Sequence, residues 1–274
     1  MKTNSILKLT VLFAVFLFAS CAKDNNDLSS ILTTTDIAES AKLISAGDDI
    51  SNLVESQLNI SDGILGKNVQ FLPSCANVTR NPLTGVPAIG GNIIKTIDFG
   101  TGCSLTNGNT LKGKIILTFP YFPNATSHII TCSFDNFYHN NIKIEGTKTF
   151  TRTITTNGPT VVVAMDIVAT HPNGHIHHKV GTVTRTMTAG YSTPLDIFDN
   201  VYSITGSWTN TSNNMVMTAS ITSPIIVKLN CNHIVQGIIS YVRGVNTATL
   251  DYGDGVCDDV AIFTLNGIVH TITL

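Results

Sequence analysis

The apolar and polar positions of the chain follow two different periods. Before residue 63, apolar residues recur at the three- and four-residue spacing of helices, among them Leu28, Ile31, Leu32, Ile37, Ala38, Ala41, Ile50, Leu53, Val54 and Leu58. A break around Gly47 predicts two helices within 28–62. Asp36-x-x-Glu39 fits a capping box for the first helix, Gly47 its C′ position, and Asp49 the cap of the second. We expect these helices to pack on a sheet or to form a stalk.

Beyond Gly63 the pattern changes to that of strands, with runs rich in Val, Ile, Thr and Phe between turn residues. In 142–154 most even positions are apolar and most odd positions polar, which predicts one buried and one wet face. The even apolar residues are Ile142, Ile144, Phe150 and Ile154. Similar runs lie at 112–119, 128–134, 160–168, 200–209 and 235–242. Asn266-Gly267 between two apolar runs predicts a type I′ hairpin.

No long helical pattern follows Gly63, so the crossovers that parallel strands need are missing. We therefore expect an all-β fold over 63–274, an antiparallel meander that closes as a barrel or sandwich and carries an N-terminal helical segment. Either closure would hide the apolar face of a long sheet. With 274 residues the chain can bury a large core.

Composition narrows the class of partner. The chain has 16 Lys and Arg against 18 Asp and Glu, a net charge of −2, and no basic block. This argues against nucleic acid, which requires clustered cations to neutralise phosphates. The sequence also lacks a Gly-x-Ser-x-Gly elbow, a His-Glu-x-x-His motif and a phosphate loop. We expect a protein that is not an enzyme and uses no cofactor.

The first 20 residues have the features of a secretion signal. Lys2 and Lys8 precede an apolar stretch that is too short to span a bilayer comfortably. The segment Phe18-Ala19-Ser20-Cys21 resembles the lipobox of bacterial lipoproteins, in which the cysteine is diacylated and becomes the first residue. This predicts removal of 1–20 and acyl chains such as palmitate on Cys21, which would hold the protein to a membrane. The alternative is an ordinary signal peptide with an incidental cysteine.

Residues 21–27 would then form a polar tether. Within it, Lys23-Asp24-Asn25-Asn26-Asp27 is similar to the short acidic export signal of surface lipoproteins in Bacteroidota-type bacteria. A solvated linker would have the same composition. We expect the folded part to lie at the outer membrane or cell surface.

Two sequence patterns each occur twice in the chain, and each such pair is called an echo below. Phe-Asp-Asn occurs at 134–136 and 198–200, each time predicting a turn followed by a strand with an internal glycine. Thr-Ile-Asp-Phe-Gly-Thr-Gly-Cys at 96–103 is matched by Thr-Leu-Asp-Tyr-Gly-Asp-Gly-Val-Cys at 249–257, and each has another cysteine upstream at a nearly equal separation. These echoes indicate an internal pseudo-repeat.

In an exported protein this similarity predicts two disulfides, Cys75 with Cys103 and Cys231 with Cys257. Cys132 would remain single, as a small buried apolar residue. The alternatives are a zinc site, for which no Cys-x-x-Cys exists, or five free thiols, which suit an oxidising compartment poorly.

Together, the 96–103 and 250–258 motifs, the two Phe-Asp-Asn segments and the terminal Asn-Gly hairpin resemble a family of uncharacterised exported lipoproteins of Bacteroidota-type bacteria. The resemblance covers roughly Cys75 to Leu274. It implies an exported β protein, and it implies no activity, ligand or catalytic residue.

Histidines are concentrated at 171–178. His175 and His177 would share one face of a strand at a spacing suited to two metal ligands. No carboxylate lies near them in the sequence, and Pro172-Asn173-Gly174 suits a hairpin turn. We therefore expect polar residues flanking an exposed turn rather than a metal site.

Two further groups of residues suggest binding but have simpler explanations. Asp251, Asp254, Asp258 and Asp259 surround a glycine-rich turn, yet their spacing does not fit an EF-hand, and the echo at Asp98 lacks the other acids. We expect them to be structural. Tyr202 and Trp208 would share a strand face and could form an aromatic platform, although packing in the sheet is the simpler expectation.

The function expected from these features is that of a lipid-anchored envelope lipoprotein, a binding or structural module that acts on a glycan or protein. The alternative is a carrier of a lipid-like ligand in a concave apolar sheet covered by the N-terminal helices. The low charged fraction of 12% supports that alternative.

Overall fold

The computed structural model describes residues 31–61, 72–122, 125–193 and 196–274, without the side chains of 58–61. The predicted signal peptide, the lipidation site Cys21 and the tether at 21–27 lie outside the described residues. Among the described residues, no helix combines the length and apolar character that a membrane-spanning helix needs.

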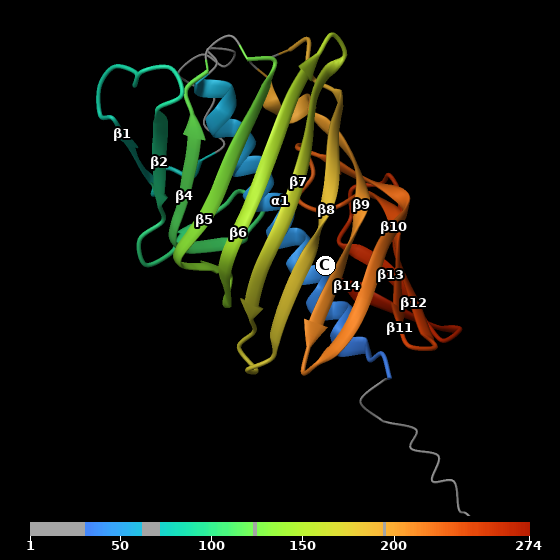
Figure 1. Cartoon of the computed structure of the whole chain (residues 1–274). Coiled ribbons are helices and arrows are strands. Elements are labelled where there is room, and N and C mark those ends of the chain that lie inside the picture. Colours follow the sequence, from blue (N-terminus) through green and yellow to red (C-terminus); the bar gives the residue numbers. More distant parts are fainter. Residues whose placement is uncertain (1–30, 62–71, 123–124, 194–195) are drawn as a thin grey trace, which may run out of the picture.

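In the described part of the chain, one α-helix and a single antiparallel sheet make up the fold (Figure 1). The helix is α1 (Thr34–Ser61), and η2 (Ile197–Asp199) is a short 3₁₀ turn. The strands are β1 (Asn77–Asn81), β2 (Asn92–Asp98), β3 (Cys103–Ser104), β4 (Thr110–Pro120), β5 (Ser127–His139), β6 (Ile142–Thr155), β7 (Gly158–Thr170), β8 (Ile176–Ala189), β9 (Val201–Ser212), β10 (Met215–Lys228), β11 (Gln236–Arg243), β12 (Asn246–Asp254), β13 (Val260–Leu265) and β14 (Ile268–Thr273).

The strands follow one another in sequence order from β1 to β14, with β3 as a side branch on β4. The predicted antiparallel meander is therefore confirmed. The barrel, one of the two predicted closures, does not form: β1 and β14 are both edge strands and the sheet is open. Helix α1 lies across the concave face of the sheet (Figure 1), and its side chains form two clusters with the apolar residues of that face.

The prediction of two helices was wrong, because α1 runs without a break through Gly47. A mid-helix glycine costs about 1 kcal/mol relative to alanine, whereas Ala46, Ile50 and Leu53 around it are buried against the sheet. The capping box also lies earlier than predicted. Thr33 Oγ1 accepts a hydrogen bond from the Asp36 amide at 3.2 Å, and Asp36 Oδ2 accepts one from the Thr33 amide at 2.8 Å.

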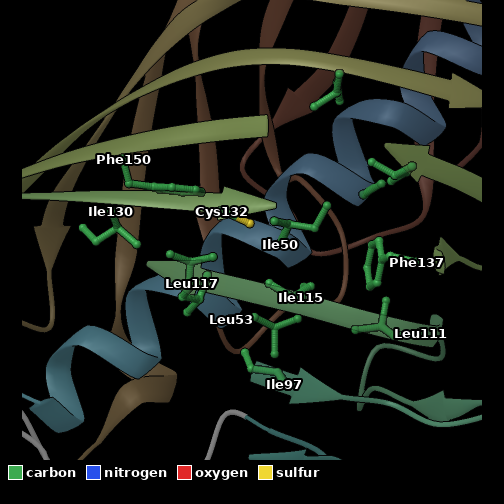
Figure 2. Close-up of a cluster of buried hydrophobic side chains, with 14 of the residues drawn as sticks. Ile50, Leu53, Ile97, Leu111, Ile115, Leu117, Ile130, Cys132, Phe137 and Phe150 are labelled. Atoms are coloured by element: carbon green, nitrogen blue, oxygen red, sulfur yellow. The ribbon is translucent and has the colours of Figure 1, made fainter. Parts of the chain in front are cut away.

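The helix takes part in two apolar clusters. Its C-terminal half packs on β2 and β4–β7, where Ile50 and Leu53 meet Ile97, Ile115 and Phe137 (Figure 2). Its N-terminal end packs through Ile37, together with Leu32 just before the helix, on residues of β8–β13. The alternation predicted for 142–154 is confirmed at Ile142, Ile144 and Phe150, which are buried, and Ile154 is half-buried.

The predicted turn chemistry is only partly correct. Asn266 and Gly267 both have positive φ, 49° and 84°, and join β13 to β14 as predicted. The Phe-Asp-Asn at 198–200 follows the prediction, since it forms η2 and its cap. The one at 134–136 is instead a bulge inside β5, with Asn136 at φ 47°, because β6 continues to pair on both sides of it.

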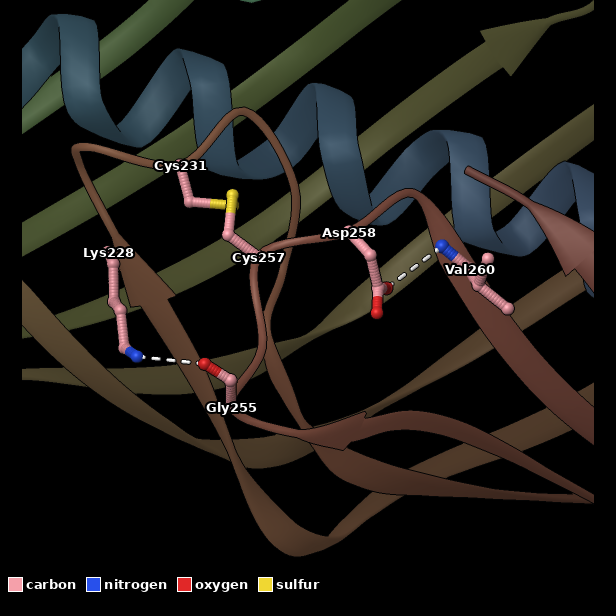
Figure 3. Close-up of a disulfide and its surroundings, with 6 residues drawn as sticks. All are labelled: Lys228, Cys231, Gly255, Cys257, Asp258 and Val260. Atoms are coloured by element: carbon pink, nitrogen blue, oxygen red, sulfur yellow. Dashed lines mark hydrogen bonds between the residues drawn. A yellow bond between two sulfur atoms is a disulfide. The ribbon is translucent and has the colours of Figure 1, made fainter.

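Both predicted disulfides are present, Cys75 with Cys103 and Cys231 with Cys257, at sequence separations of 28 and 26. Cys132 is buried and unpaired, as expected. Figure 3 shows the second disulfide beside the aspartate-rich turn, where Asp258 Oδ1 accepts a hydrogen bond from the Val260 amide at 3.1 Å. This backbone contact agrees with the structural role expected for the aspartates.

Candidate functional site

Buried cations line the concave face of the sheet. Because side chains alternate along each strand, six basic side chains point to the same face as the apolar residues. They are Lys95, Lys148, Arg152, Lys179, Arg185 and Arg243. Lys148 and Arg152 occupy even positions of β6, on the same face as Ile144 and Phe150. The sequence prediction overlooked them, although their even numbering was a signal that could have placed them inside.

Acidic residues of α1 meet these cations. Arg185 donates from Nε to Glu55 Oε1 at 2.8 Å, from Nη2 to Asn52 Oδ1 at 2.6 Å, and from Nη1 to Asp48. Burial raises the pKa of Glu55 above its ordinary value, and the Arg185 charge offsets only part of that rise. These contacts hold the helix at one position on the sheet.

Both ends of the helix are held in a similar way. Arg243 donates to the two carboxylate oxygens of Asp36 at 2.7 and 3.1 Å. Although burial raises it, the pKa of Asp36 is lowered overall by hydrogen bonds from Arg243 and Thr33. Lys95 donates to the Gln57 carbonyl at 2.7 Å near the other end. These ion pairs and hydrogen bonds are explained by helix docking alone.

The histidine-rich turn between β7 and β8 lies against the first half of α1. Glu39 Oε2 is 2.8 Å from His177 Nε2, and Glu39 Oε1 accepts a hydrogen bond from Asn173 at 2.8 Å. His175 Nδ1 lies 3.2 Å from the same Oε1. The His171 and His177 rings meet edge to face at 5.1 Å. One ligand atom from each of Glu39, His171 and His177 lies within 4.8 Å of the other two.

These positions correct the prediction of an exposed turn. The side chain of His175 is 49% exposed, as expected, but His177 and His171 are buried. The carboxylate that is missing nearby in the sequence is supplied by Glu39, 138 residues before His177. His178 points to the opposite face of β8, where it pairs with the exposed Asp166 at 2.6 Å.

A cavity of about 660 Å³ opens beside this cluster, and His171 lies in its wall. Its lining comes from α1, Asn109 before β4, the β5–β6 and β7–β8 turns with the strand ends beside them, the β10–β11 loop, β12, and the end of β14 with Leu274. The buried Tyr252 hydroxyl and His171 Nε2 have no hydrogen-bond partner among the described residues. Unpaired buried polar atoms are destabilising, so they mark a place where water or a ligand can bind.

A second polar group lies between α1 and β8–β9. Lys179 Nζ lies 4.2 Å from the centre of the Trp208 ring, and burial lowers the pKa of Lys179 to about 7. Tyr202 and Trp208 are buried on the concave face, which confirms packing over an exposed aromatic platform. The adjoining cavity measures only about 60 Å³.

Comparisons of the chain with protein-family models, with curated proteins and with solved structures found no match. What the site can bind is therefore inferred from its own residues alone. Sequence reasoning found His175 and His177 but missed Glu39 and His171. His171 is only six residues before His177, whereas nothing local to the turn indicates Glu39.

Proposed function

We propose that the protein is an exported binding protein, anchored at the outer membrane or cell surface through acyl chains on Cys21, that holds a small polar ligand in the cavity beside α1. The lipobox-like segment at 18–21 and the likeness to exported lipoproteins support the anchor. The two disulfides support an oxidising compartment. A binding rather than catalytic role is proposed because the sequence carries no catalytic motif.

The cavity is the main evidence that the protein binds a ligand. Its volume of about 660 Å³ falls within the ≈ 300–1,000 Å³ usual for small-molecule sites. Side chains that donate hydrogen bonds line it, namely Lys42, Ser45, Asn140, Asn141, His233 and Tyr252, together with apolar residues such as Ile142 and Ile234. No Asp or Glu side chain is among the described lining residues. A neutral or acidic molecule of mono- to disaccharide size fits this chemistry.

The space between α1 and the sheet does not favour the alternative of a lipid carrier covered by the helix, which the low charged fraction suggested. The concave apolar face is packed against α1 in two clusters. The cavity left between α1 and β8–β9, about 60 Å³, is far below the size of a ligand site.

The anchor is tested by palmitate labelling in the native host. We expect the wild type to incorporate label and to fractionate with membranes, and Cys21→Ser to lose both properties. An unlabelled wild-type protein would contradict the anchor, whatever the cavity binds.

The ligand is tested by native mass spectrometry and by calorimetric titration with a panel of neutral and acidic mono- and disaccharides. Tyr252→Phe removes the unpaired hydroxyl in the cavity, so we expect it to weaken binding. Removing an unsatisfied group costs little stability. Tyr241→Phe is the matched control: its buried hydroxyl contacts Ser40 Oγ at 3.3 Å, and it is not among the cavity residues. It should leave binding unchanged. No bound mass and no saccharide binding would contradict the proposal.

A further inference from the structure

We propose that Glu39, His171 and His177 bind a divalent transition-metal ion of the zinc class. The donor set is two imidazole nitrogens and one carboxylate oxygen, which suits zinc and its neighbours better than calcium or magnesium. The inference does not depend on whether the cavity holds a saccharide.

The distances place the three donors close to a coordination shell. Zinc lies at about 2.0–2.2 Å from such ligand atoms, so the donors of a tetrahedral site are roughly 3.4 Å apart. Here the donor atoms lie within 4.8 Å of one another, and Glu39 Oε2 and His177 Nε2 are 2.8 Å apart. Side-chain rotations that bring the three donor atoms to this common spacing would complete the arrangement.

His171 distinguishes this cluster from an ordinary hydrogen-bonded network. The residue is only 5% exposed, and its Nε2 has no hydrogen-bond partner among the described residues. A buried nitrogen of this kind destabilises the fold unless something satisfies it. A metal ion bound to Nε2 would do so.

Glu39 differs from three of the other acids of α1, Asp36, Asp48 and Glu55, and resembles Asp49, whose partners are His139 and the Asn107 and Asn109 amides. Asp36 and Glu55 face arginines, whereas the described partners of Glu39 are the Asn173 amide and imidazoles. A bound cation would supply the missing positive charge. Asn173 holds Oε1, which leaves Oε2 directed at His177, an orientation of the kind that outer partners impose on metal ligands.

The site has room for a further ligand. Three protein donors leave a position for water, for His175 or for a molecule in the cavity. His175 Nδ1 already lies 3.2 Å from Glu39 Oε1, and its side chain is half-exposed. His171 belongs both to the cluster and to the cavity wall.

The test uses the full chain without a polyhistidine tag, stripped with EDTA and titrated with Zn²⁺ by calorimetry and with Co²⁺ by visible absorption. We expect one ion per chain and the absorption of tetrahedral cobalt. His171→Gln and Glu39→Gln should each weaken zinc binding by roughly 100-fold or more, because loss of an outer partner alone costs 10–100-fold.

His178→Gln is the matched control. It lies in the same strand, one residue from His177, but pairs with Asp166 on the exposed face, so zinc affinity should not change. Should a ligand variant fail to fold, X-ray absorption of the zinc-loaded wild type still decides, with imidazole ligands and no sulfur expected. The proposal is overturned if the wild type binds no stoichiometric zinc, if both ligand variants keep wild-type affinity, or if sulfur coordinates the ion. Saccharide titration in EDTA tests the proposed function separately.

Discussion

Replacing Arg185 by methionine is the sharpest test of how α1 is held. The guanidinium makes hydrogen bonds to Glu55, Asn52 and Asp48 while its own side chain is 2% exposed. Charge-assisted bonds contribute about 1.5–3 kcal/mol each, so three of them set an upper range of roughly 4.5–9 kcal/mol. Methionine recovers part of this through apolar contacts. We therefore expect a loss of about 4 kcal/mol in the free energy of unfolding, within the 3–5 kcal/mol typical of a broken buried pair.

The measurement is urea unfolding followed by far-UV circular dichroism, with thermal melting in parallel. A loss of about 4 kcal/mol corresponds to a melting temperature lowered by roughly 8–16 °C in a domain of this size. Adding Glu55→Gln to Arg185→Met should restore part of the stability, because it removes the buried charge left unpaired. Lys143→Met is the control: the Lys143–Glu145 pair is 35% and 52% exposed, and such pairs contribute about 1 kcal/mol or less. The reasoning is refuted if Arg185→Met costs no more than this control.

Three further predictions concern the second disulfide and two buried groups. Replacing Cys231 and Cys257 together by serine should cost about 3.5 kcal/mol in urea unfolding, from the entropy of a 26-residue loop; an unchanged midpoint would contradict this. Burial lowers the pKa of Lys179 from 10.5 to about 7, so folding disfavours its charged form and stability should rise between pH 7 and pH 10; Lys179→Met should flatten that rise. Burial raises the pKa of the Cys132 thiol to about 12, so iodoacetamide should label it only in urea, as peptide mass spectrometry would reveal.

Features with a local cause could be predicted from the sequence. Alternation in 142–154 placed Ile144 and Phe150 on the buried face because successive side chains of a strand point to opposite sides. The Asn266-Gly267 hairpin followed from the positive φ angles that these residues tolerate. The disulfides could be predicted from an internal pseudo-repeat, because two similar segments with similar cysteine spacing are expected to form similar bonds.

Other features could not be predicted locally. The glycine at position 47 looked like a helix end, yet tertiary burial of its neighbours outweighs its low helix propensity. The sequence analysis did not place Lys148 and Arg152, which are buried on the side of the sheet that faces acids of α1. Propensity concerns the neighbours of a residue in the chain, whereas burial of a charge depends on partners that the fold brings from elsewhere.

By itself, the sequence determined the antiparallel strands, the cysteine pairing and the class of fold, because these depend on periods and motifs within short segments. Only the tertiary structure decided that α1 crosses the concave face as one helix, and that Glu39 meets His171 and His177 at the edge of a cavity. The physical reason is distance along the chain: 138 residues separate Glu39 from His177. Their contact depends on the position of the helix on the sheet. That position is set by two apolar clusters and by the ion pairs with arginines, and no single segment encodes it.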